Sequence, residues 1–260
     1  MKRLQIFFNT KQLQIPTPFN GILQATIYNN LSPELFYLFH EIGFRSPFSK
    51  KVFKYFNFSP LFAKNVQKQE NLLVLEKNVH FYISSFFDRF IDDLKRNLQK
   101  NGLKFNGKVF NVKCKEINFT VDKLIFDSVK RKNENEKVLC LLKVYNLFVG
   151  RYLPKSKVLE LIDFYDEKFE NVLTESVYEK IKTLFHYGLI SQFEIIFHIQ
   201  SKKLLSSQVI RLRKNFEPYQ TYTAELLIES NLKTLEIVWA CGLGNKTTNG
   251  LGFVEILKIM

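Results

Sequence analysis

The sequence predicts an α+β fold whose first half follows the βαββαβ order of ferredoxin-like domains. Two observations predict it. Apolar residues recur at helical spacing in residues 20–31 and 86–102. Strand-like stretches precede, separate and follow these helices, at residues 3–8, 71–76, 79–84 and 108–119. The hydrophobic fraction of 46% and the 27 phenylalanines provide enough apolar material for a folded globular core.

A further helix is predicted at residues 32–43, directly after the first one. Ser32 is its expected N-cap, Pro33 takes the favoured first helical position and Gly43 ends it. Its inner stripe is predicted to consist of Leu35, Leu38 and Ile42.

The second half fits another copy of the same order, although no internal sequence repeat marks it. Residues 156–188 are predicted to be helical throughout. Residues 193–200 and 221–229 are predicted strands. A helix at 231–242 then leads through a glycine-rich loop into a last strand at 252–259.

The chain is strongly basic, with 38 Lys and Arg against 25 Asp and Glu and a formal charge of +13. This excess favours a polyanionic partner such as RNA, DNA or an anionic membrane surface. The alternative is a proteome that is merely rich in lysine. Three scattered cysteines suggest neither zinc nor a disulfide framework, and no apolar run is long enough to span a bilayer. We therefore expect a cytoplasmic protein without a membrane partner.

Four glycines lie within eleven residues near the C-terminus, at Gly242, Gly244, Gly250 and Gly252, in a chain with only ten. The loop is not a Walker A motif, because Gly250 is not followed by Lys and Ser or Thr. It is not a dinucleotide fingerprint, because a helix precedes it and a strand follows. Such a loop either lays backbone amides against a phosphate chain or forms a tightly packed connection without a ligand.

The stretch ACGLGNKTTNGLGFVEI, residues 240–256, resembles the C-terminal signature of CRISPR-associated endoribonucleases of the RAMP superfamily, which cut CRISPR precursor RNA within its repeats. In that family a short helix leads into two glycine-hydrophobic-glycine motifs and a final strand. Three N-terminal stretches resemble the same family, in its order and at about its spacing. They are LQATIYNNL, LFHEIGF and KKVFKYFNFSPLF.

The resemblance implies two tandem ferredoxin-like domains, with the glycine-rich loop packed between them and RNA held along the cleft. We place the N-terminal domain, with the candidate catalytic residues, at residues 1–120. The C-terminal domain, at 121–260, would carry the loop and the RNA-binding face. From the loop we expect Gly242, Gly244, Asn245, Lys246, Gly250 and Gly252 to contact RNA.

The resemblance also implies a metal-independent and cofactor-free reaction. In it a 2′-hydroxyl attacks the adjacent phosphate and leaves a 2′,3′-cyclic phosphate or 3′-phosphate and a 5′-hydroxyl. Such chemistry requires a base, an acid and positive charge near the phosphate. Histidine suits either proton transfer. His40 matches the position of the helical catalytic histidine in family members that have one, and the other reading is a polar surface histidine.

Tyr28 matches a tyrosine that lies opposite the histidine in some family members, although an ordinary core aromatic is an equal reading. Lys51 matches a lysine that can neutralise the scissile phosphate, but Lys50 and Lys54 are close enough to take its place. The remaining histidines, at positions 80, 186 and 198, are predicted to be structural.

Arg211, Arg213 and Lys214 lie on or beside a predicted strand, followed by Tyr219 and Tyr222. Cations with nearby aromatics suit an RNA groove, and the other reading is a solvated strand edge. The expected function is therefore a CRISPR repeat endoribonuclease, and the alternative is a RAMP-fold subunit that holds repeat RNA without cutting it. The expected partners are CRISPR repeat RNA and other subunits of a CRISPR effector complex, with the protein a monomer or a homodimer.

Overall fold

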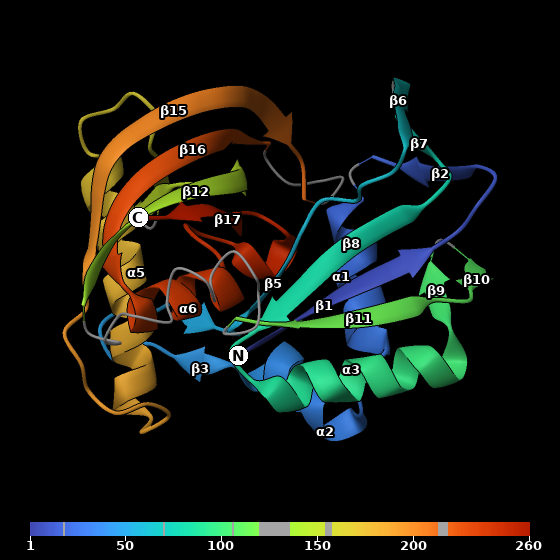
Figure 1. The fold of residues 1–260 in the computed structure, drawn as a ribbon, viewed down its shortest axis with the longest axis horizontal. Coiled ribbons are helices and arrows are strands. Elements are labelled where there is room, and N and C mark those ends of the chain that lie inside the picture. The colour runs from blue at the N-terminus through green and yellow to red at the C-terminus, as the bar shows by residue number, and fades with distance from the viewer. Residues whose placement is uncertain (18, 70, 106, 120–135, 154–157, 213–217) are drawn as a thin grey trace.

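Two four-stranded antiparallel sheets lie side by side in the computed structural model of the chain (Figure 1). The structure describes residues 1–260 except 18, 70, 106, 120–135, 154–157 and 213–217. Each sheet has helices on one face, and each has its own hydrophobic core.

The first sheet has the strand order β11-β1-β8-β5. Its strands are β1 (Lys2–Phe8), β5 (Phe56–Phe58), β8 (Val79–Ser85) and β11 (Lys113–Asn118). The helices between them are α1 (Asn20–Asn29), α2 (Pro33–Phe36), η1 (Tyr37–Ile42) and α3 (Asp88–Asn101). Because β5 follows the first helices and β11 follows α3, the order along the chain is βαββαβ, as the sequence predicts.

The second sheet has the order β15-β16-β12-β17, which is the same topology traced from the other edge. Its strands are β12 (Lys137–Leu147), β15 (Phe197–Ile210), β16 (Tyr219–Asn231) and β17 (Phe253–Ile259). Helix α5 (Phe169–His186) follows β12, and α6 (Leu232–Cys241) joins β16 to the glycine-rich loop. The predicted fold class is therefore confirmed, while the predicted domain boundary at 120 and 121 lies outside the described residues.

Four smaller sheets, of two or three strands each, accompany the two four-stranded ones. They are β2 (Leu13–Pro16) with β7 (Leu72–Glu76) and β6 (Asn65–Gln69), β3 (Phe44–Arg45) with β4 (Val52–Phe53), β9 (Leu103–Phe105) with β10 (Lys108–Phe110), and β13 (Gly150–Leu153) with β14 (Val158–Leu161). Strand β14 corrects the prediction of one helix over 156–188, since α5 begins only at Phe169. Its pairing with β13 gives this backbone hydrogen bonds that helix periodicity alone does not reveal.

The two halves meet at a buried arginine. The guanidinium of Arg3 on β1 donates to the carbonyl oxygens of Trp239 (2.9 Å) and Val254 (2.8 Å) in the second half. It also lies 4.2 Å from the ring centroid of Trp239 and 4.3 Å from that of Phe253. A buried cation with such partners fixes β1 of one half against α6 and β17 of the other.

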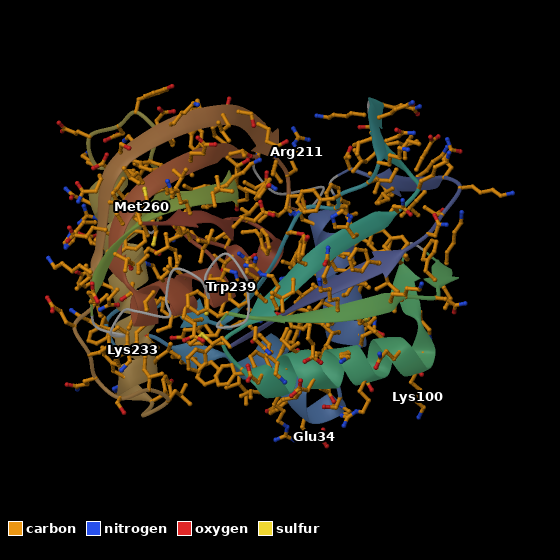
Figure 2. All side chains as sticks on the ribbon, in the orientation of Figure 1. Glu34, Lys100, Arg211, Lys233, Trp239 and Met260 are labelled. Atoms are coloured by element: carbon orange, nitrogen blue, oxygen red, sulfur yellow. The ribbon has the colours of Figure 1, made fainter. Side chains whose placement is uncertain are left out.

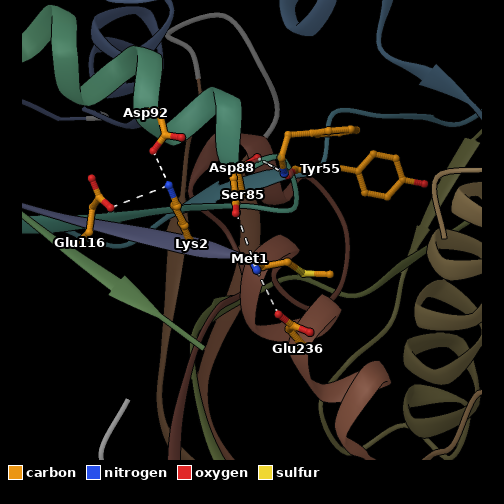
Figure 3. Close-up of polar contacts among 9 residues, drawn as sticks. Met1, Lys2, Tyr55, Ser85, Asp88, Asp92, Glu116 and Glu236 are labelled. Atoms are coloured by element: carbon orange, nitrogen blue, oxygen red, sulfur yellow. Dashed lines mark hydrogen bonds and ion pairs between the residues drawn. The ribbon is translucent and has the colours of Figure 1, made fainter. Parts of the chain in front are cut away.

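Ion pairs border this junction (Figure 3). Lys2 bonds Asp92 of α3 at 2.6 Å and lies 3.9 Å from Glu116 of β11. The amino group of Met1 lies between Asp88 of α3 and Glu236 of α6, so side chains from both halves converge there. Trp239 lies near the centre of the molecule between the two sheets (Figure 2).

Candidate functional site

His40 lies on η1, a π-helical turn that continues α2. π-Helical turns are rare in proteins, and those that occur are often found at functional sites. The wider turn changes the predicted inner stripe, because Phe39 is buried while Ile42 is 48% exposed. Leu35 is buried as expected, and the segment ends at Gly43 with a positive φ of 62°. The imidazole of His40 is 45% exposed, so it is open to solvent.

Aromatic rings and a carboxylate hold the imidazole of His40 in place. Its ring stacks on Phe36, with the centroids 4.8 Å apart, and meets Tyr28 edge to face at 4.7 Å. Nδ1 of His40 lies 2.6 Å from Oε1 of Glu41. Donation from Nδ1 to this carboxylate leaves Nε2 as the nitrogen available to a substrate.

Tyr28 joins this cluster through its ring. The side chain is only 4% exposed, and its hydroxyl donates to the carbonyl oxygen of Phe39 at 3.4 Å. Burial holds the pKa of Tyr28 well above its usual value. The structure therefore brings Tyr28 and His40 together, as the resemblance predicts, with the tyrosine ring beside the imidazole.

The lysines of residues 50–54 take different positions. The Nζ of Lys54 donates to the backbone oxygen of His40 and lies 5.5 Å from the ring centroid of Tyr28. Burial lowers the pKa of Lys54. The Nζ of Lys51 instead pairs with Oε2 of Glu179 at 2.7 Å, on α5 of the other half.

Glu179, the partner of Lys51, is itself held in place by further contacts. The Glu179 side chain is 15% exposed and also accepts a hydrogen bond from the hydroxyl of Ser49. Burial pushes the pKa of Glu179 upward, but hydrogen bonds from Lys51 and Ser49 outweigh it and keep the pKa below its usual value. Of the three lysines, Lys54 is therefore the one in direct contact with the His40 cluster.

A cavity of about 1180 Å³ opens between the two halves beside this cluster. Residues 48–55, α5 and the glycine-rich loop line it. Six of its lining residues are basic, at Lys50, Lys51, Lys54, Arg151, Lys180 and Lys246, and two are acidic, at Glu175 and Glu179. Because Lys54 contacts both His40 and this cavity, the two form one continuous region with a positive balance.

The glycine-rich loop is packed between the halves. All four glycines have positive φ and are buried. A Cβ on Gly242 would lie 1.9 Å from Nδ2 of Asn57, and one on Gly250 would lie 2.3 Å from the ring of Phe58. Both neighbours belong to β5 of the first half. These two glycines therefore allow β5 to approach the loop closely. The loop thus lies between the two halves, which is the position that the resemblance predicts for it.

The loop is also hydrogen-bonded to α1 of the first half. The side chains of Asn20 and Gln24 donate to the backbone oxygens of Asn249 and Thr248, each at 2.8 Å. Asn245 is turned to its own half, since its side-chain oxygen accepts from the amide of Gly150 at 3.0 Å. The loop is thus fixed from both sides.

The polar tip of the loop faces the cavity. The amides of Lys246, Thr247 and Thr248 donate no hydrogen bond within the described part of the chain, and all three residues line the cavity. The Lys246 side chain is exposed, with Nζ 5.1 Å from the ring centroid of Tyr219. These amides and the Lys246 side chain are the polar groups that the tip of the loop turns toward the cavity.

A buried lysine donates hydrogen bonds to the backbone at the start of the loop. The Nζ of Lys180 on α5 donates to the carbonyl oxygens of Gly242 (2.6 Å) and Cys241 (3.5 Å), at the end of α6. Burial lowers the pKa of Lys180 to about 8 and raises the pKa of Cys241 to about 12. Tyr55 from the first half donates to the backbone oxygen of Lys180 at 2.8 Å, which links α5 to the first half.

The predicted basic face is partly described. Arg211 is exposed just beyond β15 (Figure 2), while Arg213 and Lys214 lie outside the described residues. His186 ends α5 and His198 lies exposed on β15. His80 lies between the rings of Phe7 and Phe62 on the first sheet.

Within the described ranges, no three His, Cys, Asp or Glu side chains are grouped to hold a metal ion. Across those same ranges, no helix has both the length and the apolar character that a membrane crossing requires.

Two ferredoxin-like units packed side by side form a fold that solved structures share. One is described as "CRISPR associated protein Cas6", with a TM-score of 0.68 and 17% identity, covering 99% of each chain. Another, "An RAMP protein binding different RNA substrates", has a TM-score of 0.69 and 15% identity over 99% of this chain and 100% of that one. A third, described as a Cas6-related gene from Pyrococcus furiosus, has a TM-score of 0.70 and 16% identity over 98% of each chain.

The sequence itself matches a family model in its C-terminal part. Residues 151–256 match the model described as "CRISPR associated protein Cas6, C-terminal". This match bears out the predicted resemblance to the CRISPR-associated RAMP family at the C-terminal end of the sequence, and the solved structures share the predicted fold. No curated protein sequence matches the chain.

Several residues of the site carry no signal in the sequence. Glu41 beside His40 is an ordinary surface glutamate by sequence, and Phe36 fits any helix. Glu179 lies 128 residues from Lys51 along the chain, so only the fold brings them together. The buried Lys180 occurs in a predicted helix, where lysine usually marks the solvated face.

Proposed function

We propose that the protein is a metal-independent endoribonuclease that cuts CRISPR precursor RNA within its repeats and so matures guide RNA for antiviral defence. The observation that supports this most is the exposed His40, whose ring is oriented by Tyr28, Phe36 and Glu41 at the border of a basic cavity. The family resemblance supplies the substrate class.

In the proposed reaction the 2′-oxygen of one nucleotide loses its proton and attacks the adjacent phosphorus. The bond from phosphorus to the 5′-oxygen breaks, and that oxygen takes a proton. The products are a 2′,3′-cyclic phosphate and a 5′-hydroxyl. Nε2 of His40 performs one of these two proton transfers, since it is exposed and its other ring nitrogen faces Glu41.

The surrounding cations stabilise the charge that develops on the phosphate. Lys54 is nearest to His40, and Lys51 reaches the same cavity from its pair with Glu179. Tyr28 acts as a positioning residue, because its hydroxyl is buried against a backbone oxygen while its ring abuts His40. The amides of residues 246–248 hold a neighbouring phosphate of the RNA.

The test is cleavage of the host's own CRISPR repeat RNA in EDTA. A matched RNA carries a 2′-deoxy sugar at the cut site. We expect the first RNA to be cut and the second to remain intact, with product ends that carry cyclic phosphate and 5′-hydroxyl. Cutting of the deoxy RNA, or cutting only after a divalent ion is added, would contradict the mechanism.

Tight binding of both RNAs without cutting would support the second candidate function, a RAMP-fold subunit that holds repeat RNA. The similarity in fold to a RAMP protein described as binding different RNA substrates favours keeping this alternative.

A further inference from the structure

The turn between β3 and β4 in the first half is held by hydrogen bonds of its own. It covers residues 46–51, and the amide of Ser46 donates to the carbonyl oxygen of Lys51 at 2.8 Å. The hydroxyl oxygen of Ser49 accepts from the amide of Lys51 at 3.1 Å. These bonds close the turn from within, so the side chain of Lys51 is presented from a fixed backbone.

One side chain of the second half also contacts this turn. Oε2 of Glu179 on α5 lies 2.7 Å from Nζ of Lys51, and Oε1 accepts a hydrogen bond from the hydroxyl of Ser49. Both carboxylate oxygens therefore have a partner in the turn. The Glu179 side chain is 15% exposed and that of Lys51 is 32% exposed, so the lysine is the more accessible of the two partners.

This ion pair lies in the cavity between the halves, since Ser49, Lys51 and Glu179 all line it. A lysine ammonium binds a carboxylate and a phosphate through the same donors. A phosphate that joined the intact pair would place two anions on one cation, and the anions would repel each other. Ion pairs that are partly exposed contribute little to stability, so Lys51 can leave Glu179 at small cost.

We propose that Glu179 is an internal competitor for the RNA phosphate at Lys51. In the free protein its carboxylate occupies the lysine, and a phosphate of the bound RNA takes its place. An RNA that brings no phosphate within reach of Lys51 leaves the pair intact and gains nothing from this lysine. The proposal rests on the proposed function in taking RNA as the ligand of the cavity, and it names what holds Lys51 before RNA binds.

Affinity for repeat RNA with a 2′-deoxy sugar at the cut site tests the competition without interference from cleavage. Glu179→Gln keeps the shape of the side chain and removes its charge, and we expect about fivefold tighter binding. Glu175→Gln is the matched control, because Glu175 lies one turn earlier on α5 and lines the same cavity. It should change the affinity less than twofold. Unchanged or weaker binding by Glu179→Gln would overturn the proposal, because the carboxylate would then not oppose the RNA.

Replacement of Lys51 separates competition from plain repulsion between Glu179 and RNA. If the carboxylate competes for the lysine, Glu179→Gln gains about fivefold in affinity when Lys51 is present and less than twofold in the Lys51→Gln background. If the carboxylate only repels RNA, the gain is at least as large in the Lys51→Gln background, because no ammonium then neutralises the carboxylate. This second result would overturn the proposal.

Glu179→Asp is a second variant, and it leaves the net charge unchanged. Its side chain is one methylene shorter, so it reaches Lys51 and Ser49 less well than the glutamate does. We expect it to bind the same RNA about twofold more tightly, and urea denaturation of each variant checks that it is folded. An affinity equal to or below that of the unmodified protein would contradict the competition.

Cleavage of the all-ribose repeat RNA in EDTA by the unmodified protein reports separately on the proposed function. Cleavage without a gain in affinity for Glu179→Gln would overturn the competition and leave the enzyme. A gain that depends on Lys51, without cleavage, would support the competition and count against the enzyme.

Discussion

The second helices of the two halves end in the same way, yet the turns that follow them serve different purposes. Helix α3 stops at Gly102 with φ 70° and ψ 174°, and α6 stops at Gly242 with φ 75° and ψ 170°. In both, the glycine amide donates to the carbonyl four residues back, of Leu98 and Val238. The local stop signal is therefore shared by the two copies of the fold.

After the stop the two chains diverge. The chain after Gly102 forms the small β9/β10 hairpin, and a Cβ on Gly102 would lie 2.8 Å from the backbone oxygen of Phe110 in that hairpin. The chain after Gly242 enters the junction, where a Cβ would lie 1.9 Å from Asn57 of the other half. One glycine shapes a local turn, while the other joins the two halves around the cavity.

The largest stability effect should therefore follow Gly242→Ala. A side chain at positive φ costs about 1–3 kcal/mol, and overlap with a closely packed neighbour costs a further 1–3 kcal/mol or so. We expect a loss of about 3 kcal/mol or more in the free energy of unfolding, measured by urea denaturation.

Two matched variants test the difference between the turns at Gly102 and Gly242. Gly102→Ala should cost about 2 kcal/mol, because its neighbours lie in a hairpin of the same half that can shift. Gly107→Ala should cost about 1 kcal/mol, since its φ is +74° but no atom lies within 4 Å of the added Cβ. A loss for Gly102→Ala equal to that for Gly242→Ala would remove the distinction between the two turns.

A smaller, pH-dependent effect should come from Lys180, which supports the end of α6. Its pKa is lowered by burial from 10.5 to about 8, so below pH 8 it is protonated in both the folded and unfolded states and its burial cost is fully present. As the pH rises from 8 toward 10.5, the unfolded state holds more protons and stability increases. This single group should raise the free energy of unfolding by about 2 kcal/mol between pH 7.5 and pH 9.5.

The measurement is the difference in unfolding free energy between the unmodified protein and Lys180→Met at these two pH values. Cys241 has the opposite sign, because its raised pKa makes stability fall above pH 9, and this contribution largely cancels in the difference. Lys182→Met, at an exposed position of the same helix, is the control and should show no such pH dependence. A pH-independent difference for Lys180→Met would contradict the assignment.

Much of the fold follows from local patterns in the sequence. The apolar stripes of α3 and α6 and the strand-like runs in β1, β8 and β16 predict their type, because each has one face against a core. The segment 158–161 is different. Its apolar run suits a helix or a strand, and pairing with β13 decides the outcome. The predicted resemblance to the CRISPR-associated family is confirmed at the C-terminal end, where residues 151–256 match its family model.

The site is only partly predictable. His40, Tyr28 and the loop position follow from the family resemblance, and the structure brings His40 and Tyr28 into contact. The π-helical turn at Tyr37–Ile42 depends on backbone hydrogen bonding that side-chain periodicity does not encode. The division of labour between Lys51 and Lys54 depends on Glu179, which reaches Lys51 only once the two halves have packed. The roles proposed for these residues in RNA cleavage stay predictions.

We expect the first half of the protein to supply the cleavage chemistry through His40. The most direct test is single-turnover cleavage of repeat RNA in EDTA, with RNA affinity measured in parallel, for His40→Ala and for His186→Ala as the control at another exposed histidine. We expect His40→Ala to cut about 100-fold more slowly or worse while it binds RNA normally, and His186→Ala to cut at the original rate. Unimpaired cleavage by His40→Ala would contradict it.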